Sequence, residues 1–143
     1  MRIKKLHEDS VLPTRGSEQA AGWDLYAYIP EGSAEIAAAG VCKIGTGVAI
    51  ALDPASAALI LPRSGLATKQ GLRPANTPGL IDSDYRGEVI VALYNDSQET
   101  RTVQHGDRIG QMVIIPYITD SFVLSDSLEE TDRGAGGFGS TGK

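Results

Sequence analysis

Residues 23–29 read Trp-Asp-Leu-Tyr-Ala-Tyr-Ile, and this stretch decides the fold class. Every second residue from Trp23 to Ile29 is apolar, and Asp24, Tyr26 and Tyr28 stand between them. Successive side chains of a β-strand point to opposite faces, so a period of two predicts a strand with one buried face.

The same period recurs along the chain. Residues 48–52 alternate in the same way, and further strand-like runs follow at residues 57–61, 88–94, 111–115 and 122–124. Gly, Pro, Asn and Asp punctuate these runs, as they do in turns. Many short strands with turn signals between them predict an all-β fold, a distorted jelly roll or β-sandwich.

Two segments have helical character. Residues 33–39 have good helix propensity and are followed by Gly40. In the segment Ser64–Gln70, Ser64 is suited to be the N-cap, and Gly71 is suited to end the helix.

Length and composition indicate one domain. The chain has 143 residues, of which 41% are hydrophobic, enough for a real core. We expect a β domain over residues 1–132 and a flexible glycine-rich lid over residues 133–143, since residues 134–143 contain five glycines.

Charge and cysteine content exclude several classes. The net charge is -5, so we expect no nucleic-acid partner. There is no long apolar run, and residues 1–5 lack the apolar stretch of a signal peptide, so we expect no membrane span and a cytoplasmic location. Cys42 is the single cysteine, and we expect a buried, inert thiol. His7 and His105 lack metal-ligand spacing and are expected at the surface.

Residues 62–67, Pro-Arg-Ser-Gly-Leu-Ala, have the features of an anion site. Ser64 would lie at a helix start behind Arg63, and Gly65 would let a phosphate approach the backbone. The residues alone leave open an ordinary capped helix with a surface arginine.

Residues 76–87 are dense in turn formers and predict a β-hairpin with an elaborate tip. Asp82 and Asp84 are two apart, so on a strand they would share one face, with Ser83 on the other. Either carboxylate is suited to be a general base or a metal contact. The alternative is a polar loop in which both aspartates are turn formers.

Two later segments add candidates. Arg108 and Gln111 open an apolar strand but lie three apart, so we expect one to face a site and the other its rim. In the tail, Arg133, Phe138 and the hydroxyls after it would suit a lid over a phosphorylated aromatic ligand. A tail without function is the alternative.

Taken together, these segments resemble the five motifs of the trimeric dUTPase family, in the family's order. The matching stretches are residues 21–27, 62–67, 76–87, 108–111 and 133–142. Gly110 stands where the family usually has Ala, and Ala75 where Gly is common. The family has a loop at residues 33–39, so the resemblance favours a single short helix.

The resemblance implies a jelly-roll subunit in a homotrimer with sites at subunit boundaries. It implies hydrolysis of dUTP to dUMP and pyrophosphate by water attack at the α-phosphate. Such a reaction limits uracil incorporation into DNA and supplies dUMP for dTMP synthesis. It also implies Mg²⁺ as cofactor, held by the substrate phosphates and water rather than by direct protein ligands.

Site residues follow from the same resemblance. Asp82 would be the general base, assisted by Gln111, while Asp24 would position the water shell of the metal or Asp82 itself. The implied phosphate-binding residues are Arg63, Ser64, Gly65 and Gln111. The implied nucleoside-binding residues are Asn76, Gly79 and Ile81 for uracil and Tyr85 for deoxyribose. The implied lid residues are Arg133, Phe138, Gly139, Ser140 and Thr141.

Two rival functions stay open. A dCTP deaminase has a related fold, but it carries Glu rather than Asp near the hairpin base, so Asp82 and Tyr85 favour dUTPase. A regulatory binding protein that kept the fold is the other rival. A pure binder would have no need of Asp82, Gln111 and the tail, so their presence favours an enzyme.

Overall fold

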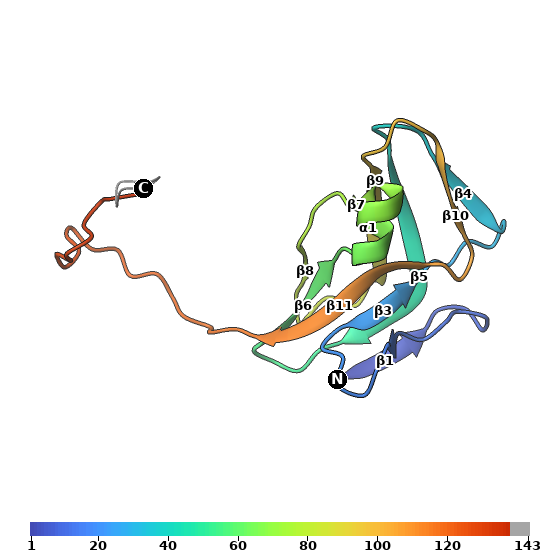
Figure 1. Cartoon of the computed structure of the whole chain (residues 1–143). Helices are drawn as coiled ribbons and strands as arrows, with labels where there is room; N and C mark the ends of the chain where they lie inside the picture. The colour runs from blue at the N-terminus through green and yellow to red at the C-terminus, as the bar shows by residue number, and fades with distance from the viewer. Residues whose placement is uncertain (138–143) are drawn as a thin grey trace.

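A computed structural model of the chain, which describes residues 1–137, is an antiparallel β-sandwich with one short helix (Figure 1). In spatial order, one sheet contains β1 (Arg2–Lys5), β5 (Val41–Ala51), β9 (Glu88–Asn95) and β7 (Leu72–Pro74). A second contains β2 (Thr14–Arg15), β3 (Trp23–Tyr26), β11 (Arg108–Pro116), β6 (Ser56–Leu61) and β8 (Gly79–Ile81). A third pairs β10 (Arg101–Gln104) with β4 (Ser33–Ile36), and α1 spans Ser64–Gln70. The predicted all-β, jelly-roll-like fold with one helix is confirmed.

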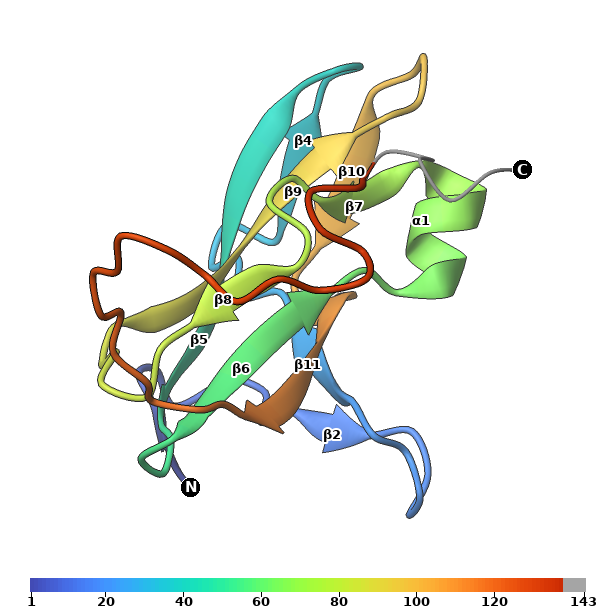
Figure 2. The same cartoon turned by 90° about the vertical axis from the view of Figure 1, so that its left-hand side faces the viewer.

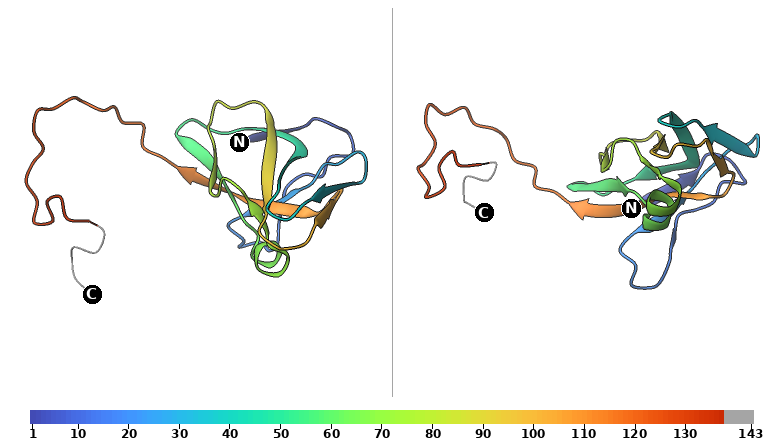
Figure 3. Two further views of the ribbon diagram at one scale, coloured as in Figure 1. Left: turned by 90° about the horizontal axis from the view of Figure 1, so that it is seen from above. Right: turned by 45° about the horizontal axis from the view of Figure 1, so that its top comes forward.

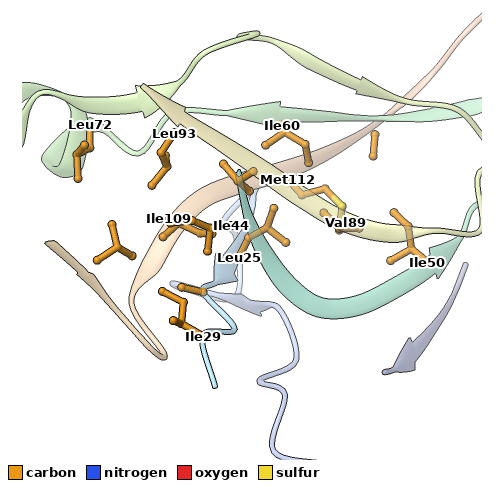
Figure 4. Close-up of a cluster of buried hydrophobic side chains, with 14 of the residues drawn as sticks. Leu25, Ile29, Ile44, Ile50, Ile60, Leu72, Val89, Leu93, Ile109 and Met112 are labelled. Carbon is orange, nitrogen blue, oxygen red and sulfur yellow. The ribbon is translucent and has the colours of Figure 1, made fainter. Parts of the chain in front are cut away.

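The core lies between the two larger sheets (Figure 4). The four-stranded sheet contributes the buried residues Ile44, Ile50, Val89, Val91 and Leu93, and the five-stranded sheet contributes Leu25, Ala58, Ile60, Ile109 and Met112. Burial of apolar surface at roughly 25 cal/mol per Å² is the main force that holds the sheets together. The alternation predicted at residues 23–29 is confirmed in burial, since Leu25, Ala27 and Ile29 are buried.

The structure corrects the helix considered at residues 33–39. The segment begins as strand β4, which pairs antiparallel with β10, and residues 37–40 form a turn. Ile36 is buried and Ala34 half-buried, while Glu35 between them is exposed. Pairing with a distant strand overrides helix propensity in so short a segment.

Helix α1 has the predicted span, but its N-cap is one residue earlier than expected. Arg63 is the N-cap, with extended backbone angles, and no side chain caps the helix, so Ser64 is its first residue. Gly71 ends the helix in the left-handed conformation, at a φ of 69°, as predicted.

The hairpin predicted around residues 76–87 is confirmed in outline. Strands β7 and β9 flank this segment and pair antiparallel, from Leu72 opposite Asn95 to Pro74 opposite Leu93. The tip contains the short strand β8, which leaves this sheet and pairs with β6 in the other (Figure 2). Asp82 lies beyond the end of β8 in a turn, so the same-face argument for the two aspartates does not apply.

The chain leaves the sandwich after β11 as an extended segment (Figures 1 and 3). The strand expected at residues 122–124 is absent, and Phe122, Val123 and Leu124 are almost fully exposed. A strand needs a neighbour for its hydrogen bonds, and none lies beside this segment among residues 1–137 of the single chain.

The structure also tests the expectations for Cys42, for the two histidines and for a membrane span. Cys42, expected to be buried, is only half-buried in β5. His7 is exposed, whereas His105 is half-buried and its Nδ1 accepts a hydrogen bond from the backbone N–H of Ile29 at 3.1 Å. No helix in the described part of the chain has the length and apolar character of a membrane span.

Candidate active site

Strands β3 and β11 place Asp24 and Gln111 side by side. The two residues are direct partners in the antiparallel register, so their side chains share one face of the sheet. Gln111 Nε2 donates a hydrogen bond to the carbonyl oxygen of Pro62 at 2.8 Å, which holds the amide beside the start of α1. A Cβ atom at Gly22 would lie 3.0 Å from Gln111 Oε1, so glycine there leaves room for this amide.

Asp24 forms ion pairs with two arginines. Its Oδ1 accepts a hydrogen bond from Arg63 Nε at 2.9 Å, and its Oδ2 accepts one from Arg108 Nη1 at 3.1 Å. The Asp24 side chain is only 13% exposed, whereas that of Arg63 is 25% exposed and that of Arg108 is 49% exposed. Two permanent positive charges on one carboxylate leave an excess of positive charge, which suits an anionic ligand.

A β-bulge brings Arg108 to this cluster. Arg108 pairs with Tyr26 and Gly110 with Leu25, so β11 has one residue more than β3 between these pairs. The extra residue shifts the alternation, and Arg108 therefore lies on the same face as Gln111. The sequence predicted one of these two residues at the rim of the site and no role for Arg108, because a bulge leaves no signal in the hydrophobic period. Gly110 within the run is the one hint.

The hairpin tip gathers a second group of expected site residues. Asp82 and Tyr85 lie at the two ends of one turn, which is closed by a hydrogen bond from Tyr85 N–H to the Asp82 carbonyl at 3.2 Å. Arg86 Nη1 donates to the carbonyl oxygens of Ser83 and Tyr85, at 2.7 and 2.8 Å. Asp82 and Tyr85 line a cavity of about 200 Å³ together with residues of β8 and β9.

The Tyr85 side chain is held in place from two directions. Its hydroxyl donates a hydrogen bond to the Glu88 carbonyl oxygen at 3.1 Å. A Cβ atom at Gly87 would lie 2.6 Å from Tyr85 Cζ, so the ring packs directly against the Gly87 backbone. A side chain at residue 87 would therefore displace the ring.

The residues expected to contact uracil lie on an edge. Strand β8, with Gly79 and Ile81 at its ends, is the last strand of the five-stranded sheet. Among the described residues, one side of its backbone has no partner strand, and such an edge presents fixed donors and acceptors. A Cβ atom at Gly79 would lie 3.3 Å from Asn76 Nδ2, so the Asn76 amide approaches this strand closely.

Within one chain, the residues around Asp24 lie apart from the residues of the hairpin tip. Ala58 pairs with Ile81, so Asp82 comes level with Ala57 near the N-terminal end of β6, whereas Leu61 and the start of α1 are at its C-terminal end. Ala57 to Leu61 is about 13 Å at roughly 3.3 Å per residue, and Arg63 lies further on. The cavity at Arg63 and Arg108, of about 200 Å³, shares no lining residue with the cavity at Asp82.

The tail residues are described only in part. Arg133 is exposed, and its Nε donates a hydrogen bond to the Gly136 carbonyl oxygen at 3.0 Å. The expected lid residues Phe138, Gly139, Ser140 and Thr141 lie outside the described residues.

Within residues 1–137, no group of three or more His, Cys, Asp or Glu side chains is arranged to hold a metal ion. Asp24, the residue expected near the metal, has both oxygens engaged by arginines.

The chain resembles known proteins over its whole length. A sequence model of the dUTPase family matches residues 8–142. The chain is 47% identical over 143 residues to a deoxyuridine 5'-triphosphate nucleotidohydrolase of Wolinella succinogenes, covering all of this chain and 94% of that protein. It is 49% identical over 132 residues to the enzyme of that name from Desulfitobacterium hafniense, covering 92% of this chain and 87% of that protein.

Solved structures agree in fold. The dUTPase of Staphylococcus bacteriophage 80alpha with dUpNHpp superposes with a TM-score of 0.87 at 23% identity, over 99% of this chain and 98% of that one. A variant of the phage phi11 dUTPase, solved with a structural Mg(II) ion, has a TM-score of 0.79 at 20% identity, over 90% and 98% of the two chains. With the family match over residues 8–142 and near-half identity to curated relatives, the chain belongs to the dUTPase family.

Proposed function

We propose that this protein hydrolyses dUTP to dUMP and pyrophosphate by water attack at the α-phosphate. The observation that carries the proposal is the relationship over the full chain to enzymes named for this reaction. The geometry is consistent with it, because two arginines on one carboxylate stand at the start of α1 and a second cavity lies at the hairpin tip.

The roles in the reaction are divided between the two groups of residues. Asp82 accepts the proton of the attacking water, and the Gln111 amide orients that water. Arg63, Ser64, Gly65 and Gln111 bind phosphate oxygens, where charge develops during phosphoryl transfer.

Residues of the hairpin select the base and the sugar. Asn76 and the edge backbone at Gly79 and Ile81 read the donor and acceptor pattern of uracil, part of which cytosine inverts. Unpaired polar groups in a closed site are costly, so an edge that matches uracil rejects cytosine. The Tyr85 ring stacks on deoxyribose and excludes a 2′-hydroxyl.

Mg²⁺ would bind through the triphosphate, since the donor set of the described residues offers no cluster for it and Asp24 is engaged. Bound there, the ion would neutralise phosphate charge and orient the leaving pyrophosphate. The chain's own part is to bind the phosphates around it.

We further propose that the working enzyme is a homotrimer. The separation of Asp82 from Arg63 along β6 supports a site shared between copies, because neither group alone has a base, a phosphate site and a nucleoside site. The exposed apolar residues of the segment after β11 support a partner for that segment. The C-terminal residues from Arg133 onward would close over bound nucleotide as a lid, separate from the domain of residues 1–132. Mass measurement in solution tests the trimer, and a monomeric active enzyme would refute it.

The activity is tested by phosphate release coupled to a pyrophosphatase, with dUTP, dCTP, dTTP and UTP as substrates and with Mg²⁺ titrated against EDTA. We expect turnover of dUTP alone. Ammonia release from dCTP would instead identify a deaminase.

The cytoplasmic location expected from the sequence stays a prediction, which cell fractionation would test.

A further inference from the structure

Arg108 has no role in the mechanism above, yet it shares a carboxylate with Arg63. We propose that Arg108 is a positioning residue for triphosphate binding: it occupies Asp24 Oδ2, and so keeps Arg63 Nη2 available to phosphate. The inference rests on the proposed function, because it takes Arg63 as a phosphate ligand.

Arg63 binds Asp24 through one nitrogen only. An arginine commonly pairs with a carboxylate through two parallel hydrogen bonds, one to each oxygen. Here Arg63 uses only Nε, on Oδ1 at 2.9 Å, because Arg108 Nη1 already occupies Oδ2 at 3.1 Å. Arg63 Nη1 lies 3.4 Å from the Arg108 carbonyl oxygen and donates to it. Of the three guanidinium nitrogens, Nη2 alone has no acceptor among residues 1–137.

Removal of Arg108 would change this arrangement. Asp24 is 13% exposed, so water would only partly replace the lost donor at Oδ2. The nearest replacement is Arg63 Nη2, since Nε of the same planar group is already bound to the other oxygen. A two-bond pair would then form between Arg63 and Asp24, and Nη2 would turn from the ligand to the carboxylate.

The bulge in β11 is what makes the arrangement possible. Without the extra residue before Gly110, Arg108 would point to the opposite face of the sheet from Asp24 and Gln111. A bulge that re-aims one side chain onto a half-buried carboxylate next to a site is consistent with a role in that site.

The test measures binding of dUpNHpp, a non-hydrolysable dUTP analogue, and of deoxyuridine, which has no phosphate. Arg108→Met is made alone and in an Asp24→Ala background, with Arg101→Met as the matched control. Arg101, on β10, also pairs with a single carboxylate, that of Glu99, but it makes no contact with Asp24 and does not line the cavity at Arg63 and Arg108. A positioning role predicts that Arg108→Met weakens dUpNHpp binding roughly tenfold, the scale of one charge-assisted hydrogen bond.

Four further results are expected. Deoxyuridine binding stays unchanged in Arg108→Met. The loss for dUpNHpp largely disappears in the Asp24→Ala background, because Arg108 then has nothing to act through. Arg108→Lys, which keeps a positive charge at Oδ2, recovers most of the affinity, and a crystal structure of Arg108→Met has Arg63 Nε and Nη2 on the two oxygens of Asp24.

An equal loss in both backgrounds would mean that Arg108 contacts phosphate directly, and unchanged binding would mean that it has no role; either overturns the inference. If Arg108→Met does not fold, Arg108→Gln takes its place in the same comparison. Failure of the unaltered protein to bind dUpNHpp would refute the proposed function. The position of Arg63 in the crystal structure of the variant still decides the inference in that case.

Discussion

Asp82 is the residue on which the proposed chemistry depends most. It lies in the turn that closes on Tyr85, at the edge of the hairpin cavity, and not on a strand. A carboxylate that lines a cavity is suited to accept a proton from a water bound there.

Asp82→Asn keeps the shape and removes the base. We expect turnover of dUTP to fall by about 10²–10⁴-fold, the usual contribution of a general base, while dUpNHpp binding survives. Steady-state kinetics and calorimetry measure the two quantities. Asp84→Asn, a neighbour in the same turn, is the control. Near-normal turnover in Asp82→Asn would exclude Asp82 as the base.

Tyr85 is expected to select deoxyribose over ribose. Tyr85→Ala removes the ring, so kcat/KM for UTP should rise relative to that for dUTP. Gly87→Ala should shift the ratio in the same direction, since its Cβ would displace the ring. Tyr85→Phe loses only the hydrogen bond to the Glu88 carbonyl and should change the ratio least. An unchanged ratio in Tyr85→Ala would remove Tyr85 from sugar selection.

At the scale of elements, helix α1 is short and contains no fully buried residue. Leu66 packs half-buried against the core, and the two ends add to its placement: Arg63, bound to Asp24, at the start and the left-handed Gly71 at the end. The N–H of Gly71 donates to the Ala67 carbonyl at 3.2 Å, and its carbonyl accepts a hydrogen bond from Asp96 at 2.8 Å.

The two glycines of this element should respond differently to alanine. At Gly71 the φ of 69° is unfavourable for alanine, and a Cβ would lie 3.0 Å from the Ser97 backbone nitrogen, so Gly71→Ala should cost about 1–2 kcal/mol and lower Tm. At Gly65 nothing lies within 4 Å of a Cβ, so Gly65→Ala should leave Tm unchanged or raise it.

Activity separates the two variants further. If phosphate approaches the backbone at Gly65, the added methyl group should raise KM for dUTP although the fold is intact. Thermal melts and kinetics on both variants measure these effects. A lower Tm for Gly65→Ala than for Gly71→Ala would contradict this account of the helix.

At the scale of the whole molecule, the division of the site between the two ends of β6 is the main feature. Within one chain, Asp82 lies near one end of β6, and Arg63 and Arg108 lie beyond the other. The segment after Pro116 is long enough to reach a neighbour, because an extended chain covers up to about 3.3–3.6 Å per residue.

Two inactive variants should therefore rescue each other. One is Asp82→Asn with an intact tail, and the other is a chain cut after Asp132 with Asp82 intact. In randomly mixed trimers, roughly a quarter of sites would combine a good hairpin with a good tail from another chain. Co-refolding at equal amounts and dUTP hydrolysis measure this. No recovery in trimers shown by mass to be mixed would mean that hairpin and tail act within one chain.

The class of fold and most of its strands could be predicted from the sequence alone. The alternation at residues 23–29, the end of α1 at Gly71 and the hairpin around residues 76–87 were all predicted. These features depend on short-range physics: side-chain period, the freedom of glycine and turn chemistry act within a few residues. The five motifs also carry the family relationship, because each is a short run of residues that can be compared one position at a time.

How these elements pack and pair is set by tertiary contacts. The tertiary structure turned residues 33–36 into a strand, set the register that separates Asp82 from Arg63, and used a bulge to bring Arg108 and Gln111 to Asp24. Each of these depends on pairing with a strand far away in the chain, and a shift of one residue in such a pairing moves a side chain to the other face. A period along one strand contains no information about the register of its partner, which is why the pairing of both arginines with Asp24 is visible only in three dimensions.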